Sequence, residues 1–292
     1  MKYINIIEFL EDVFDFKPTL FQKVLLKKLT KEPLCQKQLH NIQYIAKTSF
    51  GVLNIENCIE GTENMLTTEH NLWLLLTTAQ KIQEPTQENN NFFIHLGRQS
   101  GVSTMLEFMK FWEAYEFLID AYTLKTSYLS VHVQELFSRS RVVTPKYLRA
   151  FIEKFNLKIF QETTHEIKLE SSDKKIVIFR SQYSPDFDYN HEKTVEKLIP
   201  YKIDLLVGEL IDISKLDRIK AKKKLCAHTG ELERSRVNDC LSFMKTPSGE
   251  AYTYVSGVDN TLCTGLTPYR SSPELPWIRD FVCRSIFEEP ID

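Results

Sequence analysis

The residues best suited to chemistry follow a short apolar strand expected over residues 92–96. They form a loop from Gly97 to Ser103 with two glycines, and an amphipathic helix is expected to begin at Thr104. Because the first N–H groups of a helix have no partner within it, a strand, a glycine loop and a helix start together form an anion site. The hydroxyl of Ser103 or Thr104 stands where it could ligate the Mg²⁺ of a nucleotide. The spacing therefore predicts a phosphate-binding loop.

This loop departs from the standard phosphate-binding pattern at two positions. The standard pattern has lysine just before the hydroxyl, where this chain has Val102, and its first glycine falls on Leu96. The lysine would make a charge-assisted contact with the phosphates. Arg98 is the nearby cation that could replace it. The alternative interpretation is an ordinary strand–turn–helix that binds nothing.

The rest of the chain supplies elements that could position this loop. Strands alternate with helices, which favours a mostly parallel sheet covered by helices. Pro18 divides the first helical stretch in two, and Pro145 suits the first turn of a later helix. The expected helices cover residues 4–31 with a break at 17–19, 104–118 and 145–155, and the expected strands cover 128–131, 203–207, 222–227 and a hairpin of 166–170 with 175–179.

Composition bounds the class of protein. The 292 residues are 42% hydrophobic, enough to bury a core, and the net charge of -2 gives no global positive field for nucleic acid. Charged residues such as Glu8 and Glu11 interrupt the N-terminal apolar residues, so no secretory signal is expected. The longest charge-free apolar run, residues 72–79, is too short for a membrane span, which predicts a soluble protein. The six cysteines make no C-x-x-C pair, and the spacing of Cys226, His228 and Cys240 fits no common zinc site.

The loop Arg98-Gln99-Ser100-Gly101-Val102-Ser103-Thr104 resembles the deviant phosphate loop of large terminases, the ATPases that package DNA into tailed-phage heads. In that family the loop begins with a basic residue and glutamine, and some members have an apolar residue in place of the lysine. Other motifs follow in the family's order. Phe21-Gln22 resembles the adenine-reading glutamine, residues 205–209 the second acidic motif, and residues 224–230 the coupling strand. The resemblance covers about residues 18–230 and depends on this co-linear order.

The resemblance implies an α/β P-loop NTPase fold of the ASCE/RecA-like type, with a mostly parallel sheet flanked by helices. It implies a helical segment over residues 1–90, an ATPase core over 91–240 and a turn-rich extension over 241–292. ATP and Mg²⁺ are the implied cofactors, with Ser103 as the metal ligand. Glu209 would orient the attacking water and Arg98 would hold the phosphates. The implied nucleotide-binding residues are Gln22, Gln99, Ser100, Gly101, Ser103, Thr104 and Thr229.

Two departures from the family shape the expected partners. Gly208 stands where the family has the aspartate of an Asp-Glu pair that holds Mg²⁺ through water. Too few residues follow Gly230 for the nuclease domain that terminases usually carry. The implied setting is the host cytoplasm at a procapsid portal, with no membrane. The implied partners are double-stranded DNA, the portal ring, and a small terminase or a separate nuclease chain, and a homo-oligomer is left open.

Other interpretations stay open. Val102 and Gly208 together favour a non-catalytic protein with an assembly or interaction role in the packaging machinery. A superfamily-2 helicase would need a second motor domain. The segment Pro185-Asp186-Phe187-Asp188 lacks the acidic-x-Lys continuation that a nuclease needs. The basic run over residues 215–224 is either a solvated face or a contact with the DNA backbone.

Overall fold

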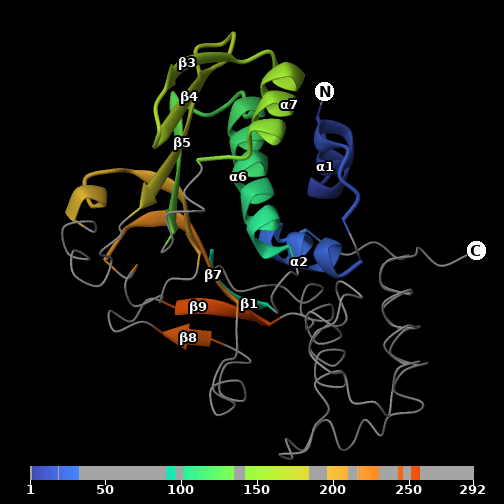
Figure 1. The fold of residues 1–292 in the computed structure, drawn as a ribbon, viewed down its shortest axis with the longest axis vertical. Coiled ribbons are helices and arrows are strands. Elements are labelled where there is room, and N and C mark those ends of the chain that lie inside the picture. Colours follow the sequence, from blue (N-terminus) through green and yellow to red (C-terminus); the bar gives the residue numbers. More distant parts are fainter. Residues whose placement is uncertain are drawn as a thin grey trace, which may run out of the picture.

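The computed structural model describes residues 2–18, 20–32, 90–96, 101–134, 142–183, 196–209, 216, 218–229, 243–245 and 251–256. Within them, four helices lie on one side of a sheet (Figure 1). The helices are α1 (Ile6–Phe14), α2 (Leu20–Thr30), α6 (Val102–Ile119) and α7 (Pro145–Phe155). The strands are β1 (Asn91–Leu96), β2 (Ser127–Gln134), β3 (Lys158–Glu162), β4 (Glu166–Glu170), β5 (Ile176–Tyr183), β6 (Ile203–Glu209), β7 (Ala221–Thr229), β8 (Phe243–Lys245) and β9 (Ala251–Ser256).

The strands form one nine-stranded sheet in the order β3-β4-β5-β2-β6-β7-β1-β9-β8. The six central strands from β5 to β9 pair in parallel, and β3, β4 and β8 run antiparallel at the two edges. The strand β7 lies between β1, which leads into the glycine loop, and β6, which ends at Glu209. The predicted α/β class, with a mostly parallel sheet covered by helices, is confirmed. The sheet also continues past residue 240 through β8 and β9.

Local sequence explains where the first helices begin and end. Asn5 caps α1 by accepting hydrogen bonds from the backbone N–H groups of Ile7 and Glu8. Asp15 ends α1 in the left-handed conformation, and Pro18 stands in the break before α2. At α7, Pro145 occupies the first turn, where its missing N–H costs nothing. These predicted boundaries are confirmed to within a few residues.

An aromatic core fills the space between the helices and the sheet. Phe9 of α1 lies 5.4 Å from Trp112 and 5.2 Å from Tyr115 of α6, between ring centroids. Phe111 of α6 lies 5.0 Å from Phe151 of α7. Aromatic pairs at these separations add to the burial of their large apolar surfaces. The core therefore holds α6, the helix that follows the glycine loop, against both α1 and α7.

Strand β2 has two different faces. Leu129, Val131 and Val133 belong to a second apolar cluster that excludes the α6 residues. Since successive side chains of a strand point to opposite faces, the alternate residues of β2 lie on the α6 side. Two of these alternate residues, His132 and Gln134, are buried and polar. The helix-side face of the sheet thus carries a polar line at the end of β2.

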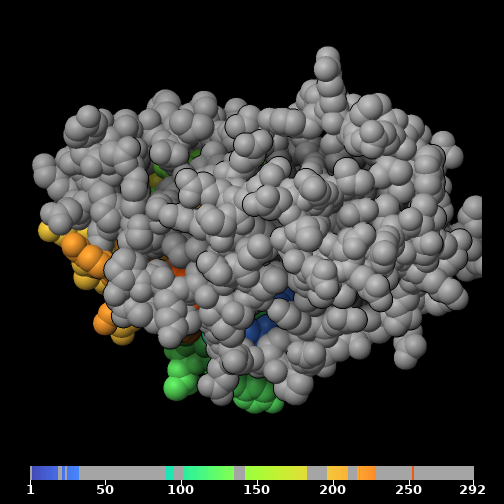
Figure 2. Space-filling model, turned by 90° about the horizontal axis from the view of Figure 1, so that it is seen from below, coloured from blue at the N-terminus to red at the C-terminus, as the bar shows by residue number. Residues whose placement is uncertain are grey.

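The segments 72–79 and 185–188 fall outside the described residues. Strand β3 has no counterpart among the expected elements, and its five residues are all exposed. None of the helices described in the structure has the length and apolar character needed to cross a bilayer. In the view from below, atoms of the segment around β6 and β7 (orange) reach the surface at one edge, and α2 (blue) reaches it nearer the middle (Figure 2).

Candidate functional site

Gly101 begins the helix of the predicted phosphate loop. It caps α6 with a φ of 83°, in the left-handed region that glycine adopts without a steric penalty. No side chain caps this end of the helix. The first N–H groups of α6 thus have no side-chain partner from their cap, as an anion site requires. Arg98, Gln99 and Ser100 lie outside the described residues.

Val102 occupies the position where the standard loop has lysine. Its side chain is only 5% exposed and belongs to the helix-side apolar core. Val102 therefore anchors the first turn of α6 in the core. The next residue, Ser103, is exposed, and Thr104 after it is half-buried.

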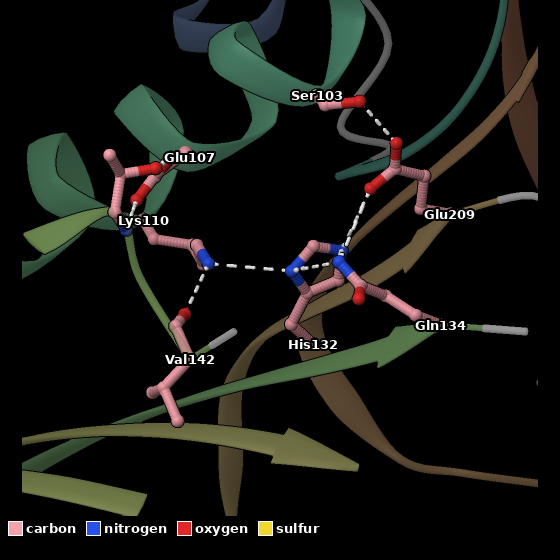
Figure 3. Close-up of polar contacts among 8 residues, drawn as sticks. Ser103, Glu107, Lys110, His132, Gln134, Val142 and Glu209 are labelled. Carbon is pink, nitrogen blue, oxygen red and sulfur yellow. Dashed lines mark hydrogen bonds and ion pairs between the residues drawn. The ribbon is translucent and has the colours of Figure 1, made fainter. Parts of the chain in front are cut away.

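Ser103 and Glu209 meet, although 106 positions separate them in the chain. The hydroxyl of Ser103 donates a hydrogen bond to Oε1 of Glu209 (Figure 3). Glu209 ends β6 and is only 4% exposed. With its proton directed at the carboxylate, the Ser103 oxygen keeps its lone pairs for another ligand. The predicted metal-ligating hydroxyl and the predicted water-orienting carboxylate therefore form one site.

Gln22 also reaches this site. A Cβ atom added to Gly101 would lie 3.0 Å from Nε2 of Gln22, so the side chain from α2 lies directly beside the start of α6. The predicted adenine-reading glutamine is thus next to the predicted phosphate loop. The backbone of Thr229 ends β7 and pairs with Leu96, the last residue of β1, which places the predicted coupling residue at the same edge of the sheet.

Gly208 has a packing role on the opposite face of the sheet. A Cβ atom at Gly208 would lie 2.5 Å from Cδ1 of Leu216 and 3.6 Å from Sγ of Cys226. Both of these neighbours belong to the second apolar cluster, away from α6. An aspartate at this position would therefore point into the apolar cluster and not toward Ser103. Any side chain at position 208 would therefore require Leu216 to move.

Three buried polar residues that the sequence analysis missed lie next to Glu209. Oε2 of Glu209 is 3.4 Å from Nε2 of His132 and 3.4 Å from Nε2 of Gln134. Nδ1 of His132 is in turn 3.4 Å from Nζ of Lys110, on α6. Lys110 also donates a 2.9 Å hydrogen bond to the carbonyl oxygen of Val142 (Figure 3). A continuous line of contacts thus runs from Ser103 through the carboxylate to the middle of α6.

Burial sets the ionisation of this line. Lys110 is 2% exposed, and its burial lowers the pKa to about 8, against the opposing effect of Glu107 and Glu209. Burial, followed by the charge of Lys110, lowers the pKa of His132 to about 4. At neutral pH, Lys110 is therefore charged and His132 is neutral.

The sequence carries patterns that could have identified these three buried residues. His132 and Gln134 alternate with Val131 and Val133, a polar–apolar alternation typical of a strand with two different faces. Lys110 is a single charge within the apolar run Phe108-Met109-Lys110-Phe111-Trp112. A lysine within such a run is buried only when it is paired, which marks it for attention.

The described lysines of the predicted basic run do not share one surface. Lys223 pairs with Glu113 on the α6 side at 2.6 Å, whereas Lys224 is buried and donates to the carbonyl of Leu216 at 3.3 Å. The exposed Lys222 lies 3.3 Å from Asp204. Within the described part of the chain, no group of three or more His, Cys, Asp or Glu residues could hold a metal ion.

Comparison with known proteins adds little to this geometry. No family model matches the chain, and no curated protein matches it. Among solved structures, the chain is similar to the large terminase of a thermophilic bacteriophage, with 9% sequence identity and a TM-score of 0.38. The similarity covers 65% of this chain and 45% of the terminase chain, so the chain spans less than half of that protein. A likeness this distant carries no argument about chemistry.

Proposed function

We propose that this chain is an ATPase domain of the terminase type, which hydrolyses ATP to drive double-stranded DNA into a viral capsid. The observation that carries the ATPase part is the contact between Ser103, at the start of α6, and Glu209, at the end of β6. The glycine loop and the Ser103 hydroxyl follow β1, and Glu209 ends β6, so they meet at the edge where the parallel strands end. Ligand sites of open α/β sheets lie at this edge.

The donor set suits a nucleotide with Mg²⁺. Hydroxyl and carboxylate oxygens are the ligands that this hard cation prefers, and Ser103 would hold it. When bound, Mg²⁺ would neutralise charge on the phosphates. The uncapped N–H groups after Gly101 would bind phosphate oxygens, with Arg98, Gln99, Ser100 and Thr104 as further contacts.

Glu209 would orient the attacking water. A buried carboxylate held at both oxygens is fixed in direction, which this role requires. The side-chain oxygen of Gln134 is buried and has no hydrogen-bond partner among the described residues, so it offers a second acceptor for a water beside the carboxylate. Gln22 would contact the adenine, and Thr229 would respond to the γ-phosphate at the end of β7.

A second function has its own support. Gly208 is packed against Leu216, and Val102 is buried in the core, so two positions that carry chemistry in a standard site serve packing here. These two features favour a non-catalytic role in assembly of the packaging machinery.

ATP turnover with Mg²⁺, with and without double-stranded DNA, separates these functions. The ATPase proposal expects turnover that rises with DNA and falls strongly in Arg98→Ala, whereas Glu162→Gln, on the exposed strand β3, serves as a control with unchanged turnover. Absence of both turnover and nucleotide binding by calorimetry would reject the ATPase and favour the assembly role. Turnover that ignores DNA would keep the ATPase and reject the packaging motor.

A further inference from the structure

Lys110 and His132 take no part in the roles assigned so far, yet both are buried and His132 contacts Glu209. Lys110 lies on α6, two turns after Ser103, and His132 lies on β2. Burying an ammonium group costs free energy unless the group is paired, so we expect the buried Lys110 to serve a function.

The chemistry of the ammonium group fixes the proton on the imidazole. A lysine ammonium carries only donors, so Nδ1 of His132, 3.4 Å from Nζ of Lys110, must be the acceptor. A neutral imidazole has one N–H, which then lies on Nε2. This nitrogen is 3.4 Å from Oε2 of Glu209 and can only donate to it.

Gln134 does not offer an alternative route for that proton. Its Nε2 lies 3.3 Å from Nδ1 and 3.2 Å from Nε2 of His132, nearly the same distance from both ring nitrogens. An amide nitrogen that is about equally close to both ring nitrogens does not select one of them, so it does not determine where the ring proton lies. Nε2 of Gln134 also lies 3.4 Å from Oε2 of Glu209, so the amide supports the same oxygen from a second direction.

We infer that Lys110 and His132 are positioning residues that form a fixed relay to Glu209. Lys110 donates to Nδ1 of His132, and Nε2–H of His132 donates to Oε2 of Glu209, which leaves Oε1 directed at Ser103. The assignment of a role in catalysis rests on the proposed ATPase function. The relay itself rests on these contacts and on the burial of Lys110 and His132, whatever the reaction of the site.

The relay has two consequences for the site. Because a neutral imidazole lies between Lys110 and Glu209, the buried carboxylate is stabilised without a direct ion pair and stays available to hold a water. The relay also ties the carboxylate on β6 to α6, the helix that begins at the phosphate loop, and Val142 holds the lysine in place from the other side. A movement of α6 would therefore reorient Glu209.

The imidazole ¹⁵N resonances of the full chain, recorded near neutral pH, test the relay without any turnover. A neutral ring with its proton on Nε2 is expected, and Lys110→Met is expected to shift the ring toward a mixture of tautomers. A ring protonated on Nδ1, or a doubly protonated ring, would overturn the relay whatever the protein does to ATP.

The role in catalysis is tested by comparing kcat with the Kd for ATP in three variants. His132→Leu is expected to lower kcat by about 10-fold to 100-fold with little change in Kd, the size seen when an outer partner of a catalytic group is lost. His132→Gln, which can accept from Lys110 and donate to Glu209, is expected to recover most of the loss. Ser130→Ala, on the same face of β2, is the matched control.

The outcomes are distinguishable. A kcat within about twofold of wild type in His132→Leu, or a loss that His132→Gln does not repair, would overturn the positioning role. A wild-type chain that does not turn over ATP would refute the proposed function, and the ¹⁵N tautomer would then decide the relay by itself.

Discussion

Gly208→Ala tests whether the packing of the second apolar cluster requires a glycine at this position. The new Cβ would lie 2.5 Å from Cδ1 of Leu216, whereas ordinary contacts are 3.4–4 Å, so Leu216 must move within a packed cluster. Overpacking of this kind costs about 1–3 kcal/mol. The φ of Gly208 is outside the left-handed region, so alanine also restricts the unfolded chain and returns about 0.4–1 kcal/mol. The free energy of unfolding should therefore fall by about 1–2 kcal/mol.

A double-mutant cycle measured by denaturant unfolding isolates this contact. Leu216→Ala alone should cost about 2–5 kcal/mol, because it leaves a cavity. In the double variant the methyl group introduced at position 208 occupies part of that cavity, so the loss should be smaller than the sum of the single losses by about 1–2 kcal/mol. Leu148→Ala, in the core on the helix side, should instead add to Gly208→Ala. Additivity of Gly208→Ala and Leu216→Ala would refute the packing explanation for Gly208.

Three further predictions concern the site. Gly101→Ala should weaken Mg²⁺-ATP binding in calorimetry, because alanine at a φ of 83° is strained by about 1–2 kcal/mol and its Cβ meets Gln22; unchanged binding would contradict this geometry. The folded pKa of Lys110, about 8, is below the unfolded value of 10.5, so the unfolded state binds more protons between these values. Relative to Lys110→Met, the free energy of unfolding of the wild type should rise by about 2 kcal/mol between about pH 7 and about pH 9.5 in urea unfolding, and a flat difference would refute the burial of the charge. His132 has a folded pKa of about 4 against 6.5, so the wild type should lose about 2 kcal/mol relative to His132→Gln as the pH falls from about 7 to about 5, and parallel acid profiles would argue against a buried neutral ring.

Much of the fold followed from local patterns. Pro18 and Pro145 marked helix boundaries, and the hairpin of β4 and β5 followed from two apolar runs around a polar turn. The fold class followed from the alternation of strands and helices. By contrast, β3 is exposed along its whole length, so its sequence carries no burial pattern that marks a strand.

The site was only partly predictable. The glycine loop and Glu209 each end or follow a strand, so their convergence follows from a parallel sheet. The partners of Glu209 depend on which strand lies beside β6, and nothing local to His132 or Gln134 specifies that neighbour. The reason for Gly208 was equally hidden, because Leu216 reaches it from beyond the end of the strand across the opposite face. Contacts between residues distant in the chain therefore determine the partners of Glu209 and the packing at Gly208, and motif spacing predicts neither.

The most direct test of the central claim compares Mg²⁺-ATP binding with Mg²⁺-ATP turnover in the wild type and in Glu209→Gln. The glutamine keeps the size of the side chain and can still accept from Ser103, but it cannot hold a water as a carboxylate does. We expect an unchanged Kd for ATP and a kcat lower by about 10²-fold to 10⁴-fold, the usual contribution of a positioned acid or base. Equal turnover in the two proteins, or no turnover in the wild type, would contradict the assignment of Ser103 and Glu209 as the centre of an ATP-hydrolysing site.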